Sequence, residues 1–175
     1  MKLLVIGQGR HGKDTFCEIA NKYFGLTFES SSHFACKEFI FDFLSDNYTS
    51  IEECYNDRHN HRKLWYDLIC DYNKNDQARL SKKLLYEFDI YCGMRSIEEY
   101  KSSKNLFDLI IWVDASERLG ITECSDSNTI KSNNADIIIK NNGTLQEFEI
   151  KVIRLLRKLT NKCCGNWDDN GLCCF

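Results

Sequence analysis

The chain has 175 residues, of which 43% are hydrophobic and 13% aromatic, and this is enough apolar material for the core of one domain. The formal net charge of −3 argues against a protein that binds nucleic acid through an overall positive charge. No stretch reaches the length of a membrane span and no signal peptide is evident, so we expect a cytoplasmic protein without a membrane partner. In that reducing compartment most of the ten cysteines are expected to be free thiols.

A glycine-rich motif with G-x-x-x-x-G-K spacing occupies residues 7–13, after the apolar run 3–6 and before a helical pattern. Strand, loop and helix in this order are typical of a phosphate-binding loop, where backbone N–H groups and the helix dipole hold an anion. Lys13 would reach the β- and γ-phosphates of ATP, and a helix-start side chain would hold Mg²⁺. The usual hydroxyl position is taken by Asp14, and Thr15 follows, so both are candidate metal ligands. The predicted ATP-binding residues are Gly7, Gly9, Arg10, His11, Gly12, Lys13, Asp14 and Thr15.

Helical and extended patterns alternate along the rest of the chain. After the loop, a helix ends at Gly25 and an apolar helix follows over 33–44. Asp76 is expected to cap a later helix. Because strands separated by helices form parallel, helix-covered sheets, the sequence predicts an α/β fold with three layers. The expected strands are 3–6, 26–28, 89–92, 107–113 and 135–139.

Residues 50–73 carry apolar side chains at intervals that place them on one face of a helix, and Arg58 and Arg62 fall within the same stripe. A buried guanidinium group needs a carboxylate partner or a bound anion. Both alternatives are open, although bidentate arginine suits the phosphate of an acceptor molecule. His59 and His61 flank the arginines, where a histidine is more often a polar surface residue than a catalytic group.

Two polar residues follow predicted strands at their carboxyl ends, where ligands of parallel sheets bind. Arg95 follows the strand over 89–92 and is either a phosphate contact or a surface arginine at a helix start. Asp114 follows the strand over 107–113 and could hold Mg²⁺ or cap the turn. The polar segment 119–134 is expected to be a mobile loop over a site.

The composition changes abruptly at residue 162. Four cysteines lie in two adjacent pairs, which could ligate zinc, although structural zinc sites usually space paired cysteines by two to four residues. The other interpretation is a loosely packed tail. The cysteines concerned are Cys163, Cys164, Cys173 and Cys174.

Four motifs resemble those of bacteriophage deoxynucleoside monophosphate kinases and, more broadly, of adenylate-kinase-like nucleotide kinases. The resemblance covers the chain from Met1 to about Leu159 and does not include the tail. It implies a P-loop kinase fold, ATP and Mg²⁺ at the glycine-rich loop, an acceptor site under the helices between the second and third strands, and an adenine-side loop after the last strand. The motifs are GKDT at 12–15, GMRS at 93–96 followed by Glu98 or Glu99, IWVDA at 111–115 and ADIIIKNNGTLQE at 135–147.

The resemblance also assigns roles to individual residues. Arg95 matches the arginine after the third core strand, Asn141 and Gly143 match the base-side loop, and Arg118 stands where a lid arginine could reach the transferred phosphoryl group. The implied organisation is a kinase domain over 1–160, with a helical acceptor-binding segment at about 30–85 and a short lid at about 115–134, and a cysteine-rich tail over 161–175.

Two positions depart from the family pattern. Cys92 ends the third strand where related kinases often carry an acidic residue. The lid region offers Arg118 and Lys131 where adenylate kinases have several arginines.

The expected function is therefore in-line transfer of the γ-phosphoryl group of ATP to a (deoxy)nucleoside monophosphate, in the host cytoplasm if the protein is viral; a homodimer is compatible with the sequence. One alternative is a kinase that acts on a hydroxymethylated pyrimidine within DNA, for which Asp14, His59 or His61 would be the base. A second alternative is a nucleotide-binding switch that transfers no phosphate.

Overall fold

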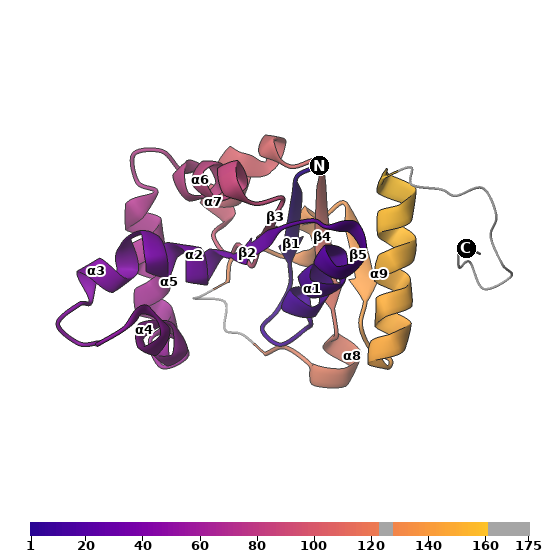
Figure 1. Cartoon of the computed structure of the whole chain (residues 1–175), viewed down its shortest axis with the longest axis horizontal. Coiled ribbons are helices and arrows are strands. Elements are labelled where there is room, and N and C mark those ends of the chain that lie inside the picture. Colours follow the sequence, from indigo (N-terminus) through magenta and orange to yellow (C-terminus); the bar gives the residue numbers. More distant parts are fainter. Residues whose placement is uncertain (123–127, 161–175) are drawn as a thin grey trace, which may run out of the picture.

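Five parallel strands form one sheet at the centre of the computed structural model, which describes residues 1–122 and 128–160 (Figure 1). The order in the sheet is β2-β3-β1-β4-β5, so the chain crosses over between non-adjacent strands. This confirms the predicted α/β fold with a parallel sheet. The strands are β1 (Leu3–Ile6), β2 (Phe28–Ser30), β3 (Ile90–Cys92), β4 (Leu109–Asp114) and β5 (Ile137–Lys140).

Strand β1 lies in the middle of the sheet and is apolar on both faces. Leu4 and Ile6 belong to the core cluster on one face, and Leu3 and Val5 belong to the cluster on the other. Such continuous burial is expected when helices cover both faces of a parallel sheet. This explains why residues 3–6 are all apolar and do not alternate with polar residues.

One face of the sheet is covered by α1 (Lys13–Phe24) and α9 (Leu145–Thr160), which lie side by side in Figure 1. Gly25 ends α1 in the left-handed conformation, as the sequence predicted. Thr144 and Glu147 exchange side-chain and backbone hydrogen bonds at the start of α9, which is a capping box.

The opposite face carries the remaining core. The predicted helix over 33–44 is a continuous helical run made of α2 (Ser31–Ala35), a π-helical segment (Cys36–Ile40) and α3 (Phe41–Phe43). Two further helices, α6 (Arg79–Glu87) and α7 (Ile97–Ser103), flank β3 in the chain.

The predicted helix over 50–73 is wrong in one respect, because the structure divides it into α4 (Ile51–Asp57) and α5 (Arg62–Tyr72). Asp57 accepts hydrogen bonds from Tyr48 (2.6 Å) and Asn60 (2.7 Å) and pairs with His61 (3.1 Å). These local side-chain contacts favour a turn over a further helical turn.

The predicted cap of α6 is also wrong. The backbone N–H of Leu80 donates to the side chain of Asn73, which is buried, over 3.0 Å. Asp76 instead accepts from the backbone N–H of Ala78 in the preceding turn.

After β4 the chain forms the short helix α8 (Ser116–Leu119), and a 3₁₀ turn (Ser132–Asn134) precedes β5. The middle of the predicted lid, 123–127, and the cysteine-rich tail lie outside the described residues. Among the helices that are described, none has the length and apolarity to cross a membrane. The cysteines of the described part are all free thiols: Cys17, Cys36, Cys54, Cys70 and Cys92.

Candidate active site

The glycine-rich loop joins β1 to α1 in a backbone conformation that requires glycine. Gly7 has a backbone φ of +148° and Gly12 one of +98°, values that residues other than glycine rarely adopt. A Cβ on Gly12 would collide with the side chain of Asn141, and one on Gly7 with the backbone oxygen of Val113. Lys13 folds back over the loop, and its ammonium group donates to the backbone oxygen of Gln8 over 2.8 Å. This cradle fits a phosphate group next to a mobile positive charge.

The side chain of His11 is buried beneath the loop, with 1% of its surface exposed. Its Nδ1 accepts from the backbone N–H of Ala115 (3.0 Å), so Nε2 carries the ring hydrogen and donates to the backbone oxygen of Gly120 (3.1 Å). Asn141 donates from Nδ2 to the backbone oxygen of His11 over 2.9 Å. The side chains of His11 and Asn141 thus brace the loop from behind.

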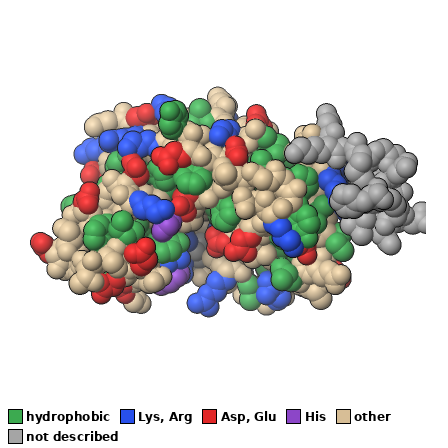
Figure 2. Space-filling view, in the orientation of Figure 1, with side chains coloured by type: hydrophobic (Ala, Val, Ile, Leu, Met, Phe, Trp, Pro, Cys, Tyr) green, Lys and Arg blue, Asp and Glu red, His purple; other side chains and the backbone are tan. Residues whose placement is uncertain are grey.

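A cavity of about 230 Å³ opens beside the loop. Figure 2 shows Lys, Arg and His side chains gathered around a hollow between the helical segment that contains α2 to α5 and the sheet. The loop side of the cavity presents Gly9, Arg10, Lys13 and Asp14. The far side presents three arginines and a histidine: Arg58, Arg62, Arg95 and His59.

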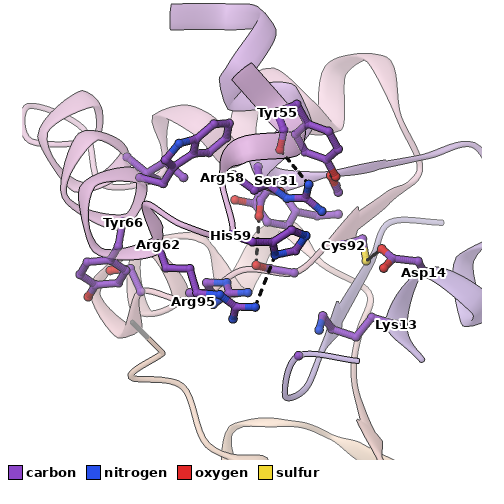
Figure 3. Close-up of a pocket in the computed structure, with 18 of the residues that line it drawn as sticks. Lys13, Asp14, Ser31, Tyr55, Arg58, His59, Arg62, Tyr66, Cys92 and Arg95 are labelled. Carbon is purple, nitrogen blue, oxygen red and sulfur yellow. Dashed lines mark hydrogen bonds between the residues drawn. The ribbon is translucent and has the colours of Figure 1, made fainter. Parts of the chain in front are cut away.

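The three arginines come from separate places in the chain and meet at this cavity, facing Lys13 and Asp14 (Figure 3). Arg58 follows α4, where its guanidinium group stacks on the Tyr55 ring at 3.7 Å and donates to the Tyr55 backbone oxygen over 2.8 Å. Arg62 opens α5 and lies 3.5 Å from Nδ1 of His59. Within the described part of the chain no carboxylate pairs with Arg58.

The pKa of His59 responds to the positive charges of the arginine cluster. Desolvation lowers the pKa of His59, and the nearby guanidinium groups of Arg58, Arg62, Arg10 and Arg95 lower it further. The imidazole is therefore biased toward its neutral form, whereas an anion placed among these side chains would be attracted.

The side chain of Asp14 lines the cavity, and that of Thr15 does not. Asp14 accepts a hydrogen bond from the thiol of Cys92 over 3.5 Å. No group of three or more His, Cys, Asp or Glu among the described residues could hold a metal ion by itself. A Mg²⁺ ion at this loop would therefore take most of its ligands from nucleotide phosphates and water, and Asp14 is the carboxylate that the loop side of the cavity offers.

Asp114 lies outside the cavity lining and has partners of its own. It accepts from the backbone N–H of Ser116 (3.0 Å) and pairs with Lys140 (2.7 Å). Burial alone would raise the pKa of Asp114, but the hydrogen bonds from Lys140 and Ser116 outweigh burial and lower the pKa to about 2. Asp114 thus makes the turn contact that the sequence allowed, and its role toward Mg²⁺ stays a prediction.

Arg118 and Gly143 do not line the cavity either. Arg118 is exposed on α8, two residues before the Gly120 carbonyl that His11 contacts. Gly143 lies in the turn before α9, against the side chain of Glu147.

No protein-family model matches the chain, and no curated protein matches its sequence. Solved structures do match. TT1252 from Thermus thermophilus is 13% identical with a TM-score of 0.51, over 94% of this chain and 98% of that one. Dephospho-CoA kinase from Campylobacter jejuni is 15% identical with a TM-score of 0.50, over 92% and 98%. Shikimate kinase from Aquifex aeolicus is 14% identical with a TM-score of 0.48, over 93% and 100%.

The chain has a P-loop kinase-like fold. At these identities the likeness covers the fold alone and carries no acceptor with it. Within this fold, the glycine-rich loop and the arginine cluster stand on opposite sides of one cavity, an arrangement suited to ATP-dependent phosphoryl transfer.

Sequence analysis missed the aromatic and acidic part of the cavity. Tyr55, Trp65, Tyr66 and Tyr91 line it, together with the buried carboxyl group of Glu99. The sequence places Trp65 and Tyr66 in the apolar stripe of a helix, and this pattern does not by itself indicate that they line a cavity. A usable signal was the position of Glu99 four residues after Arg95, in the first turn of the helix that follows the carboxyl end of β3.

Proposed function

We propose that this protein transfers the γ-phosphoryl group of ATP to the phosphate of a nucleoside monophosphate. The observation that carries the proposal is the single cavity that Lys13 shares with Arg58, Arg62 and Arg95. An uncharged sugar or alcohol acceptor has no need of three guanidinium groups opposite the donor loop, whereas an acceptor that carries a phosphate does.

In this mechanism the loop amides and Lys13 hold the donor phosphates, and the arginines hold the acceptor phosphate in line with them. Mg²⁺, with Asp14 nearby, would neutralise charge on the donor phosphates. The bond between the γ-phosphorus and the β–γ bridging oxygen breaks while a bond to an acceptor oxygen forms. No general base is needed, because the acceptor oxygen is already anionic. Neutral His59 fits a role in orienting Arg62, its contact at 3.5 Å.

The direct test is a coupled ATP-consumption assay with Mg²⁺ across ribo- and deoxynucleoside monophosphates. Modified-base duplex DNA is a separate acceptor, and Lys13→Ala controls for contaminating kinases. We expect turnover that depends on Lys13 with at least one monophosphate. If only DNA is phosphorylated, the alternative of a kinase that acts on a base within DNA replaces the proposal. If no acceptor is phosphorylated, the result favours a nucleotide-binding switch.

The double variant Arg58→Met/Arg62→Met separates acceptor binding from donor binding. Each lost charge-assisted hydrogen bond is worth about 1.5–3 kcal/mol, so the KM for the monophosphate should rise at least tenfold while ATP affinity stays unchanged. Arg79→Met is the matched control, since Arg79 stacks on Tyr72 at 4.1 Å in the same way but does not line the cavity. If the double variant and Arg79→Met have the same KM for the monophosphate, Arg58 and Arg62 do not bind the acceptor phosphate.

A further inference from the structure

The carboxyl group of Glu99 lies at the cavity wall although the residue is only 2% exposed. Its Oε1 atom accepts hydrogen bonds from the hydroxyl groups of Tyr91 (2.8 Å) and Ser81 (2.9 Å). The hydroxyl of Ser103 holds the Glu99 backbone oxygen at 2.6 Å. A buried acidic side chain is thus fixed from β3, α6 and α7 at a place that a bound molecule can reach.

The hydrogen bonds of Glu99 determine which of its oxygens can carry a proton. Burial raises the pKa of Glu99 to about 7, although the hydroxyls of Tyr91 and Ser81 act in the opposite direction. Because both lone pairs of Oε1 are taken by donors, the proton of the neutral acid belongs on Oε2. Oε2 has no hydrogen-bond partner in the part of the chain that the structure describes. Neutral Glu99 therefore offers one O–H donor.

A second donor without a partner in the described part of the chain belongs to Trp65, a residue that lines the same cavity. Trp65 is 4% exposed, and its indole N–H has no hydrogen-bond partner among the described residues. A buried donor without a partner is costly, and an acceptor atom of a ligand would supply the missing partner. Tyr55 and Tyr66 add aromatic surface beside it, and Tyr66 and Tyr55 are both visible around the cavity in Figure 3.

We propose that Glu99 and Trp65 select the acceptor by its ring: the cavity takes a planar heterocyclic base whose edge presents hydrogen-bond acceptors, a carbonyl oxygen or an unprotonated ring nitrogen. Glu99 donates to this edge from Oε2 and Trp65 donates from Nε1, while the arginines hold the phosphate of the same molecule. The inference rests on the proposed function and adds the basis of its substrate choice.

The substitution Glu99→Gln tests the donor role without disturbing the network. The amide oxygen of glutamine accepts from Tyr91 and Ser81 as Oε1 does, and the amide nitrogen donates in place of Oε2. Unlike the carboxyl group, the amide cannot lose its donor as the pH rises. The other titratable or charged groups that line the cavity near Glu99 are Tyr91 from β3, Cys70 from α5 and Arg95 before α7, and all are retained in the variant.

The measurement is calorimetric binding of the four deoxynucleoside monophosphates at pH 6 and pH 8.5, without ATP, to the wild type, Glu99→Gln and Trp65→Phe. We expect the wild type to lose roughly tenfold more affinity than Glu99→Gln between the two pH values, because a carboxyl group with a pKa near 7 is largely ionised at pH 8.5. Trp65→Phe keeps the aromatic surface and should bind about tenfold more weakly at both pH values. Deoxyribose 5-phosphate, which has no base, should bind all three proteins equally.

Weak binding by Glu99→Gln at pH 6 would mean that Glu99 works as an ionised acceptor and would overturn the inference. Equal pH dependence in the wild type and Glu99→Gln would also overturn it, as would unchanged binding by Trp65→Phe. If the wild type neither binds nor phosphorylates any monophosphate, the proposed function itself fails. Phosphorylation of monophosphates by all three proteins with equal KM would remove only the role of the two side chains.

Discussion

Cys92 donates its thiol hydrogen to Oδ1 of Asp14 over 3.5 Å, where the end of β3 meets the start of α1. The resemblance to nucleotide kinases predicts an acidic residue at the position of Cys92. In the structure the carboxylate beside Cys92 belongs to Asp14, one residue after Lys13.

We therefore expect Asp14→Asn to weaken Mg²⁺ use more than Thr15→Val does. The concentration of Mg²⁺ that gives half-maximal rate should rise at least tenfold in Asp14→Asn, because a neutral amide attracts the cation far less than a carboxylate. Mg²⁺ titration of ATP consumption checks this. A larger effect of Thr15→Val would mean that the hydroxyl group of Thr15, and not the carboxylate of Asp14, binds Mg²⁺.

Replacing His11 should loosen the loop and the segment after β4 together. In His11→Ala the buried N–H of Ala115 loses its acceptor and the Gly120 oxygen loses its donor, which we expect to cost about 1–3 kcal/mol of unfolding free energy. Thermal denaturation should show a fall of several degrees. His61→Ala is the control and should lower the melting temperature less, because the pair that His61 forms with Asp57 is exposed to solvent.

The ion pair of Asp114 with Lys140 predicts a sensitivity to acid. A carboxyl group whose pKa is lowered to about 2 stabilises the fold fully above about pH 4, and this contribution is lost as the pH falls through 2. Because the pair is partly exposed and screened, the loss should be about 1 kcal/mol. Urea denaturation of the wild type and Asp114→Asn between pH 2 and pH 5 measures it, and parallel curves for the two proteins would contradict the assignment.

Ionisation of Glu99 is expected to lower the stability of the fold as the pH rises, whereas Asp114 stabilises the fold at higher pH. Its raised pKa means that stability is fully present below about pH 4.5 and is lost as the pH rises through 7, since ionisation then occurs in a buried site. Glu99→Gln should therefore match the wild type near pH 4.5 and exceed it by about 2–3 kcal/mol at pH 8.5. Denaturant unfolding at both pH values checks the prediction. A wild type that is as stable as the variant at pH 8.5 would show that Glu99 ionises freely.

The sheet and the phosphate loop could be predicted because they depend on short-range patterns. The apolar runs of β1 and β4 are buried on both faces, and the glycines of the loop have backbone angles that few other residues adopt. The bounds of β1 are those predicted, and the bounds of the other four strands differ by one or two residues at one or both ends, as at β5, which begins at Ile137 rather than Ala135.

Other features depend on contacts that no spacing reveals. His11 and Ala115 are 104 residues apart in the chain, so the hydrogen bond between them could not be predicted from the glycine-rich motif. Arg58 and Arg62 were expected to be one turn apart on a single helix; a turn separates their helices, yet both reach the cavity. The apolar stripe around them indicated an inward-facing side, and their role as a phosphate clamp stays a prediction.

The chain leaves the sheet at Ser30 and returns at Ile90, and the strands at these two points are hydrogen-bonded neighbours, with Ser30 opposite Cys92. The residues between them form one excursion whose ends lie side by side, and it includes Arg58, Arg62 and Trp65. The phosphate loop and α1 lie outside it. The cavity is therefore closed by two separate stretches of the chain, this excursion with Arg58 and Arg62 and the segment after β3 with Arg95 and Glu99, and both stretches reach it from the carboxyl ends of neighbouring strands.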